Sequence, residues 1–284
     1  MIRSHFAITK DPFVTHERTP LLAHQQHCFD ILSVHNQQGG LCLIIGEPGT
    51  GKTVLKNKII HHNPKQWITP VINRSLHNWS NILRLLCEAF ELDASGNDHK
   101  CEARLIEEAR ELNNKGKLII PIIDDVHLIP LVALRKLRLL LEDFPKNLNL
   151  ILLGQTEFNT TLQLRPNEDI RNRITYSALI PLLSDAGLEE FIYQELDRVE
   201  LPHTTFSEAA VRLITRSSEG VLRSAKNLCI GAMIEAARDQ VREVDTKQVN
   251  AVLMQPHWRQ QRDHEVHETV TLVKDKPDYG PGGF

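Results

Sequence analysis

The feature that most constrains the fold of this chain is the octapeptide GEPGTGKT at residues 46–53, which directly follows the apolar run LCLII at residues 41–45. It matches the pattern G-x-x-x-x-G-K-[ST], in which a buried strand, a tight glycine turn and a helix follow one another. Glycines tolerate the backbone angles of such a turn, and a helix that begins near Gly51 directs unpaired N–H groups at one anion. The octapeptide therefore predicts a phosphate-binding loop inside an α/β domain.

The side chains of this loop predict ATP and Mg²⁺ as ligands. We expect Lys52 to hold the β- and γ-phosphates, and Thr53 to supply a hydroxyl for the Mg²⁺ that bridges them. The nucleotide-binding residues expected along the loop and the first turn of its helix are Gly46, Glu47, Pro48, Gly49, Thr50, Gly51, Lys52, Thr53 and Val54.

Composition limits the class of protein. A chain of 284 residues with 41% hydrophobic content is long enough for one α/β domain and a smaller appendage. No apolar run approaches the roughly 18 residues that span a bilayer, and the N-terminus lacks the apolar stretch of a signal peptide, so we expect a cytoplasmic protein without a membrane partner. The five cysteines never form C-x-x-C, and the net charge of −3 restricts any DNA contact to a local patch.

Apolar runs and helical patterns alternate along most of the chain. The expected strands are residues 41–45, 67–72, 118–123, 149–155 and 174–182, with helices between them at about 52–61, 78–92, 100–113 and 131–143. This order predicts a parallel sheet covered by helices on both faces.

Strand patterns stop at about residue 184. Amphipathic helices are expected at about 185–199, 207–217, 221–241 and 246–254, with Ser207 and Thr246 as N-caps, and they predict a small all-α lid domain. The expected division is an N-terminal segment that packs on the ATPase core (1–39), the ATPase domain (40–183), the helical lid (184–256) and a polar tail (257–284).

Two carboxylates and an amide follow expected strands. Asp124 and Asp125 end a buried run, where ligands gather in parallel sheets, so Asp124 is expected to hold Mg²⁺ and Asp125 to act as general base for an attacking water. Gln155 ends the next strand and would lie beside Asp124, within reach of the γ-phosphate. The alternatives are a pair of aspartates that caps a turn and a glutamine that contacts only solvent.

Three arginines are candidates for phosphate contacts. Arg171 and Arg173 precede the strand at 174–182 and could reach nucleotide on a neighbouring subunit, whereas Arg223 begins a helix of the lid and could sense phosphate there. Surface arginines are common, so exposed cations without a catalytic role remain the alternative for each.

In this order, the motifs resemble those of AAA+ ATPases, and more narrowly of the ExeA, TnsC and MuB group. GEPGTGKT, IIDD, LLGQTEF, the region of Arg171 and Arg173, and EGVLR are similar to that group's Walker A, Walker B, sensor 1, arginine finger and sensor 2, and HFAITKDPF and ALRKLRLLLEDF are similar to its less widespread segments. The chain departs from the family pattern at Asp125, where the family has glutamate. The shorter side chain predicts slow hydrolysis with unimpaired ATP binding.

The resemblance implies a function in DNA transposition. Secretion members of the group are longer, with a membrane anchor and a cell-wall-binding part, so a chain of this length resembles the transposon members. Those members imply a ring or filament of subunits that assembles with ATP on double-stranded DNA, presents a target to a transposase or a target-selection protein, and disassembles on hydrolysis. Two alternatives stay open, a secretion-assembly ATPase and a switch of the replication-loader or defence kind.

Possible DNA and metal contacts are weaker predictions. Asn73, Arg74, His77 and Lys100 resemble the position where these ATPases face DNA, although an ordinary solvated face is an equal alternative for each. His24 and His27 lie one helical turn apart like metal ligands, but a third ligand is lacking, which favours a plain helix face.

Overall fold

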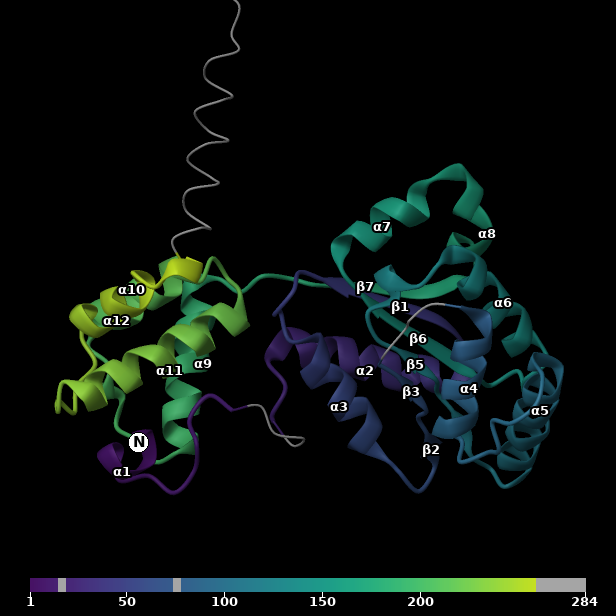
Figure 1. Ribbon diagram of the computed structural model, residues 1–284, viewed down its shortest axis with the longest axis horizontal. Coiled ribbons are helices and arrows are strands. Elements are labelled where there is room, and N and C mark those ends of the chain that lie inside the picture. The colour runs from purple at the N-terminus through teal and green to yellow at the C-terminus, as the bar shows by residue number, and fades with distance from the viewer. Residues whose placement is uncertain (15–18, 74–77, 259–284) are drawn as a thin grey trace, which may run out of the picture. The chain divides into compact units, whose positions relative to one another are not determined.

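The computed structural model describes residues 1–14, 19–73 and 78–258, which form two compact units (Figure 1). One unit lies within residues 19–182, and the other joins residues 1–14 to residues 183–258. The first 14 residues thus belong with the helical unit, whereas the sequence suggested the ATPase core. The reason is visible at Phe13, which is 1% exposed, lies 6.3 Å from both the Phe191 and Phe206 rings, and donates its N–H to Glu195 at 2.9 Å.

Residues 19–182 form the predicted α/β architecture. A five-stranded parallel sheet has the order β3-β5-β6-β1-β7, and β2 pairs with β4 in a two-stranded sheet. The strands are β1 (Gly40–Gly46), β2 (Trp67–Ile68), β3 (Val71–Ile72), β4 (Leu118–Ile119), β5 (Ile122–Ile123), β6 (Asn149–Gly154) and β7 (Ile174–Ile180). The helices are α2 (Ala23–Gln38), α3 (Lys52–His62), α4 (Trp79–Ala89), α5 (Asp98–Asn114), η1 (Val126–Leu128), α6 (Leu131–Glu142), α7 (Thr156–Gln163), η2 (Arg165–Asn167) and α8 (Glu168–Arg171).

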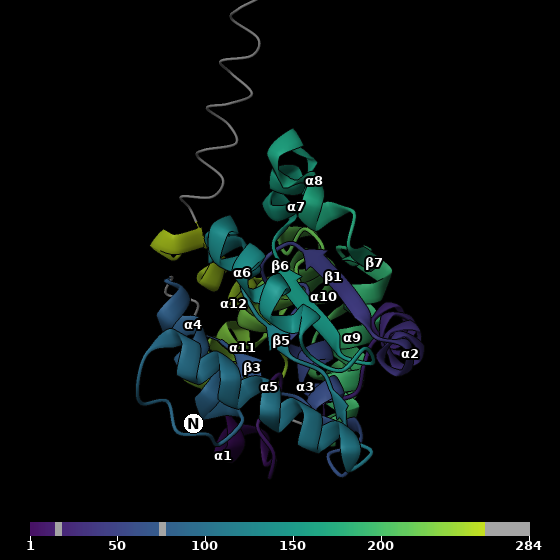
Figure 2. The same ribbon diagram turned by 90° about the vertical axis from the view of Figure 1, so that its right-hand side faces the viewer.

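Alternating residues of β1 explain why helices cover both faces of the sheet. Leu43 and Ile45 join the core formed with α4, α5 and α6, whereas Cys42 and Ile44 join the core formed with α2 and α3. Figure 1 shows α2 and α3 on one side of the central strands and α4, α5 and α6 on the other, and Figure 2 shows the same elements after a turn of 90°. The sheet is therefore buried on both sides, as the apolar run at 41–45 predicts.

Proline divides two of the predicted strands. The segments at 67–72 and 118–123 are each split, at Pro70 and Pro121, because proline has no N–H to donate to the ladder. The chain nevertheless stays extended, since the Ile122 N–H donates to the Pro70 carbonyl at 2.9 Å and the Ile151 N–H to the Pro121 carbonyl at 2.9 Å. The ends of β3 and β5 consequently reach the same edge of the sheet as the end of β1.

The second unit is helical, as predicted from residue 184 onward. Its helices are α1 (Ile2–Phe6), α9 (Asp185–Arg198), η3 (His203–Thr205), α10 (Glu208–Ser217), α11 (Leu222–Arg238) and α12 (Thr246–Leu253). Ser207 is the N-cap of α10 and accepts the Ala210 N–H at 3.1 Å. Thr246 is not the N-cap of α12, because Asp245 takes that position in a capping box with Gln248. Within the described part of the chain, no helix is long and apolar enough to cross a bilayer.

Candidate functional site

The octapeptide at residues 46–53 connects β1 to α3 through a turn that only glycine accommodates. Gly49 and Gly51 have φ angles of 87° and 99°, in the left-handed region. A Cβ at Gly46 would lie 2.9 Å from the Ile180 carbonyl oxygen and 2.9 Å from the Thr50 hydroxyl oxygen. The loop is therefore a narrow turn that has no room for a side chain at Gly46 and has backbone angles that favour glycine at Gly49 and Gly51.

An ammonium group and a helix N-terminus meet in this turn. Lys52 Nζ donates to the carbonyl oxygens of Gly46 at 2.7 Å and Glu47 at 2.9 Å. Thr50 is buried and its hydroxyl donates to the Glu47 carbonyl at 2.9 Å, whereas Thr53 is exposed on the first turn of α3. This combination of positive charge, helix N-terminus and glycine turn fits a phosphate chain.

Two residues that the sequence analysis did not assign support the loop from outside. Gln25 of α2 is 1% exposed and donates from Nε2 to the carbonyls of Thr50 at 3.5 Å and Gly51 at 3.4 Å. Thr156 of α7 donates its hydroxyl to Glu47 Oε1 at 2.5 Å. Both come from segments distant in the sequence, so only the folded topology reveals them.

Asp124 lies beside the phosphate-loop helix, at the end of β5. Its Oδ1 accepts the backbone N–H of Asp125 at 3.0 Å, and its Oδ2 accepts from Lys56 Nζ at 2.7 Å. Lys56 stands one helical turn after Lys52 on α3 and also donates to Asn73 Oδ1 at 2.9 Å. The sequence predicted the Asp124 position but missed Lys56, whose only signal was a lysine between the buried Leu55 and Ile59.

Asp125 and Gln155 complete this edge of the sheet. Asp125 is half-buried and adopts a left-handed backbone with φ of 52°, from which η1 begins. Gln155 directly follows β6, the strand between β1 and β5, and is the N-cap residue of α7. Because the strands are parallel, the phosphate loop, the two aspartates and Gln155 share the carboxyl edge of one sheet.

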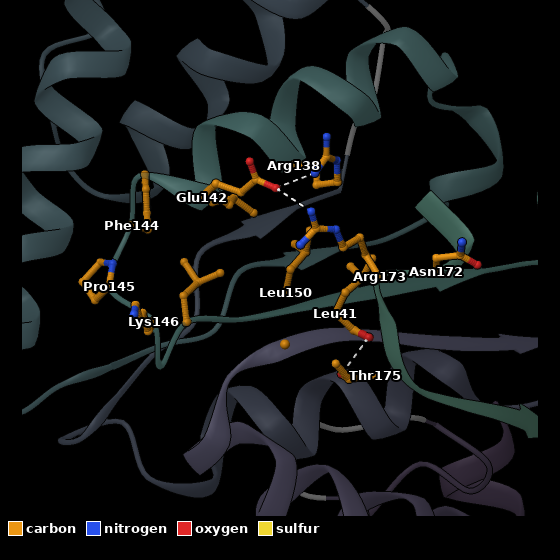
Figure 3. Close-up of a pocket in the computed structure, with 13 residues that line it drawn as sticks. Leu41, Arg138, Glu142, Phe144, Pro145, Lys146, Leu150, Asn172, Arg173 and Thr175 are labelled. Atoms are coloured by element: carbon orange, nitrogen blue, oxygen red, sulfur yellow. Dashed lines mark hydrogen bonds and ion pairs between the residues drawn. The ribbon is translucent and has the colours of Figure 1, made fainter. Parts of the chain in front are cut away.

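Arg173 lies at the opposite edge, where the strands begin. It precedes β7, whose first residue pairs with Leu41 at the start of β1. Its side chain is 63% exposed, and its guanidinium lies 3.6 Å from Glu142 Oε1, which also accepts from Arg138 at 2.5 Å (Figure 3). These three side chains line a cavity of about 590 Å³ with the apolar residues Leu41, Leu141, Phe144, Pro145, Leu148 and Leu150.

The remaining candidates lie on other segments of the chain. Arg171 donates to the carbonyl and the side-chain oxygen of Gln163 at 3.4 and 3.3 Å, which ties it to α7. Arg223 is exposed on the first turn of α11, in the helical unit. Lys100 is exposed near the start of α5, and Asn73 Oδ1 accepts a hydrogen bond from Lys56 Nζ. Arg74 and His77 lie outside the described residues.

Comparison with known sequences finds two similarities for the larger unit. Residues 35–162 match the family model described as an AAA domain. The chain is also 28% identical over 204 residues to general secretion pathway protein A of Aeromonas hydrophila, a match that covers 70% of this chain and 37% of that relative. The chain thus spans little more than a third of the length of that curated relative.

Solved structures share the fold. Cdc6p from Pyrobaculum aerophilum is similar with a TM-score of 0.67 and 14% identity, over 84% of this chain and 69% of that one. Drosophila ORC bound to DNA is similar with a TM-score of 0.65 and 17% identity, over 89% and 64% of the two chains. The Thermotoga maritima RuvB Holliday junction branch migration motor is similar with a TM-score of 0.53 and 16% identity, over 81% and 66%. Residues 35–162 of this chain therefore resemble an AAA domain in sequence, and the chain shares its fold with these solved structures.

Proposed function

We propose that this chain is an ATPase that oligomerises on double-stranded DNA in the presence of ATP, regulates a transposase, and disassembles when ATP is hydrolysed. The observation that carries the oligomer is the exposed Arg173 at the edge of the sheet opposite its own phosphate loop. An arginine so far from its own loop fits a site completed by two copies, in which Arg173 of one subunit contacts the γ-phosphate on the next. Arg171 is the less favoured candidate, because its guanidinium is already bound to Gln163.

Within one subunit, the proposed roles follow the carboxyl edge of the sheet. Lys52 and the loop N–H groups bind the phosphates, Thr53 and Asp124 hold Mg²⁺, Asp125 orients and deprotonates the attacking water, and Gln155 contacts the γ-phosphate. Bound Mg²⁺ would supply positive charge against the phosphates. The narrow glycine turn and its ammonium fit this ligand, and Arg223 of the helical unit is proposed to sense the bound phosphate.

Contact with DNA is proposed at the segment after β3 and at the start of α5. Lys100 offers an exposed cation there, and repeated weak contacts along an assembly are sufficient for backbone binding. The similar Drosophila ORC structure is bound to DNA, which supports DNA as a ligand for this chain. The transposase, and a target-selection protein, are proposed as clients from the resemblance of the motifs to the transposon members.

Two other functions each have a supporting observation. The match to general secretion pathway protein A supports a secretion-assembly ATPase. The likeness to Cdc6p and ORC supports a replication-type loader or switch, or a related switch in defence. A cytoplasmic location is part of our proposal for the DNA-bound functions.

The test is ATP hydrolysis with and without duplex DNA, combined with imaging of the protein with ATP and DNA. We expect DNA to stimulate hydrolysis and ATP to produce rings or filaments on DNA. Lys52→Ala is the control, and it should abolish ATP binding and assembly together, because it deletes the charge paired with the phosphates. A rate of hydrolysis that does not change with DNA would favour the secretion function. ATP-dependent capture of a transposase encoded beside this protein would favour transposition over the loader function.

A further inference from the structure

Lys56 carries a charge in a place where a helix side chain would ordinarily be apolar. Its neighbours Leu55 and Ile59 are fully buried, and the Lys56 side chain itself is only 11% exposed. The ammonium nevertheless has two acceptors, Asp124 Oδ2 at 2.7 Å and Asn73 Oδ1 at 2.9 Å. A buried lysine with two fixed acceptors holds a definite position rather than a solvated one.

These two acceptors end neighbouring strands of the sheet. Asn73 follows β3 and Asp124 follows β5, and the two strands pair through Val71 with Ile122 and Ile72 with Ile123. Lys56 therefore joins the ends of both strands to α3, the helix that begins at the phosphate loop. The contact couples the position of Asp124 to the position of that helix.

The same contact changes the electrostatics of Asp124. Its Oδ1 accepts the Asp125 N–H at 3.0 Å, so each carboxylate oxygen already has a donor from the chain. A divalent cation that approaches this carboxylate also meets the positive charge of Lys56 at close range, where water screens little because Asp124 is 16% exposed. The repulsion between the two cations opposes part of the attraction to the carboxylate.

We propose that Lys56 is a positioning residue of the ATPase site, which orients the Asp124 carboxylate and weakens the attraction of that carboxylate for Mg²⁺. The inference rests on the proposed magnesium role of Asp124. It makes Lys56 a determinant of the Mg²⁺ concentration at which nucleotide binds.

The experiment is a Mg²⁺ titration of the binding of a fluorescent ATP analogue to the full chain. Lys56→Met keeps the length of the stem without the charge, and it should lower the Mg²⁺ concentration for half-maximal binding by about threefold to tenfold. Lys56→Arg keeps the charge and should remain near the parental value. The matched control is Lys58→Met on the same helix, whose exposed ammonium lies 5.7 Å from the Phe29 ring centroid, and it should not shift the titration.

Equal titrations for Lys56→Met and Lys58→Met would overturn the proposal, as would an equal shift for Lys56→Arg and Lys56→Met. Thermal unfolding without nucleotide tests the ion pair of Lys56 and Asp124 independently of Mg²⁺. It also shows whether Lys56→Met folds poorly. Lys56→Met should lower Tm by about 5 to 10 °C, because it leaves a mostly buried carboxylate unpaired, and adding Asp124→Asn should restore most of this loss. If Asp124→Asn does not restore Tm, the pairing of Lys56 with Asp124 is refuted. If nucleotide binding by the parental protein does not depend on Mg²⁺, only the magnesium role of Asp124 is refuted.

Discussion

The two aspartates after β5 have different surroundings, so we expect their substitution by asparagine to have different effects on ATP binding and hydrolysis. Asp124 accepts hydrogen bonds on both oxygens, whereas Asp125 occupies a left-handed backbone position that asparagine also tolerates. Asp125→Asn should therefore keep the fold and ATP binding but slow hydrolysis by at least about a hundredfold, since only the general base is lost. Asp124→Asn should remove Mg²⁺-dependent turnover.

Both variants are tested by ATP binding and single-turnover hydrolysis at saturating Mg²⁺. The lifetime of assemblies with ATP should increase for Asp125→Asn. Hydrolysis at the parental rate in this variant would show that Asp125 is not the base.

His24 predicts a specific pH dependence of stability. Its Nε2 is buried and lacks a hydrogen-bond partner within the described residues, and burial lowers the pKa of the ring. The unfolded chain therefore binds this proton at a higher pH than the folded protein, so folding stability is lost as pH falls through the ordinary histidine range near about 6.5. His24→Gln should weaken this loss.

Urea unfolding at pH 7.5 and 5.5 measures the effect. His27→Gln serves as the control, because His27 is exposed on the next turn of α2 and should leave the parental pH dependence intact. An identical pH dependence in the two variants would exclude His24 as the source.

Some site residues could be located from the sequence and others could not. The difference is whether the feature that marks a residue lies nearby in the sequence or in a distant segment. Lys52 and the aspartates stand at the ends of apolar strands, so local order along the chain is sufficient to locate them. Lys56, Gln25 and Thr156 act through contacts with segments 68, 25 and 109 residues away. Such contacts depend on the order of strands in the sheet, which periodicity does not encode.

At the scale of elements, apolar periodicity predicted the elements that bury a continuous face. It missed α7 and α8, because the sequence TEFNTTLQ of α7 buries only Phe158 and Leu162 and otherwise looks like a polar loop. Apolar periodicity also predicted single strands across Pro70 and Pro121, where the structure has two shorter strands in each case. Asp124 and Gln155 nevertheless directly follow β5 and β6, because their positions depend only on where each strand ends.

The two helix starts in the second unit provide a paired stability test. Ser207 accepts the Ala210 N–H at 3.1 Å, so Ser207→Ala should destabilise the protein by about 1 kcal/mol. Thr246 is the first residue of α12 and Asp245 provides the cap, so Thr246→Ala should change stability by less than about 0.5 kcal/mol. Chemical denaturation of both variants decides the assignment, and equal losses would show that the cap position at α12 is wrong.

At the scale of the whole molecule, the candidate site residues divide between the two edges of one sheet. The phosphate loop, Asp124 and Gln155 follow strand ends, whereas Arg173 precedes a strand. Parallel strands all run in the same direction, so a residue before one strand and a residue after another are separated by about the length of a strand. The sequence order of motifs already implied this separation, and the pairing of Leu41 with Ile174 demonstrates it.

This separation predicts that hydrolysis is shared between subunits. Arg173→Ala should bind ATP but fail to hydrolyse it, and Lys52→Ala should fail to bind ATP, while each variant retains the residue that the other lacks. A mixture of the two variants, with ATP and duplex DNA, should therefore recover part of the activity, because some interfaces pair an intact phosphate loop with an intact Arg173. Loss of the Glu142 contact should matter little in Arg173→Ala, since an exposed ion pair contributes only about 0 to 1 kcal/mol to stability.

Hydrolysis is measured across mixing ratios, with co-assembly of the two variants followed by separate fluorescent labels. Recovery should peak at intermediate ratios, because mixed interfaces are most frequent there. Arg171→Ala mixed with Lys52→Ala is the matched control, and it should hydrolyse ATP before mixing, since the Arg171 guanidinium is held by Gln163 within its own chain. Confirmed co-assembly without any recovery by Arg173→Ala would mean that Arg173 acts inside its own subunit, and the proposed two-copy site would then be wrong.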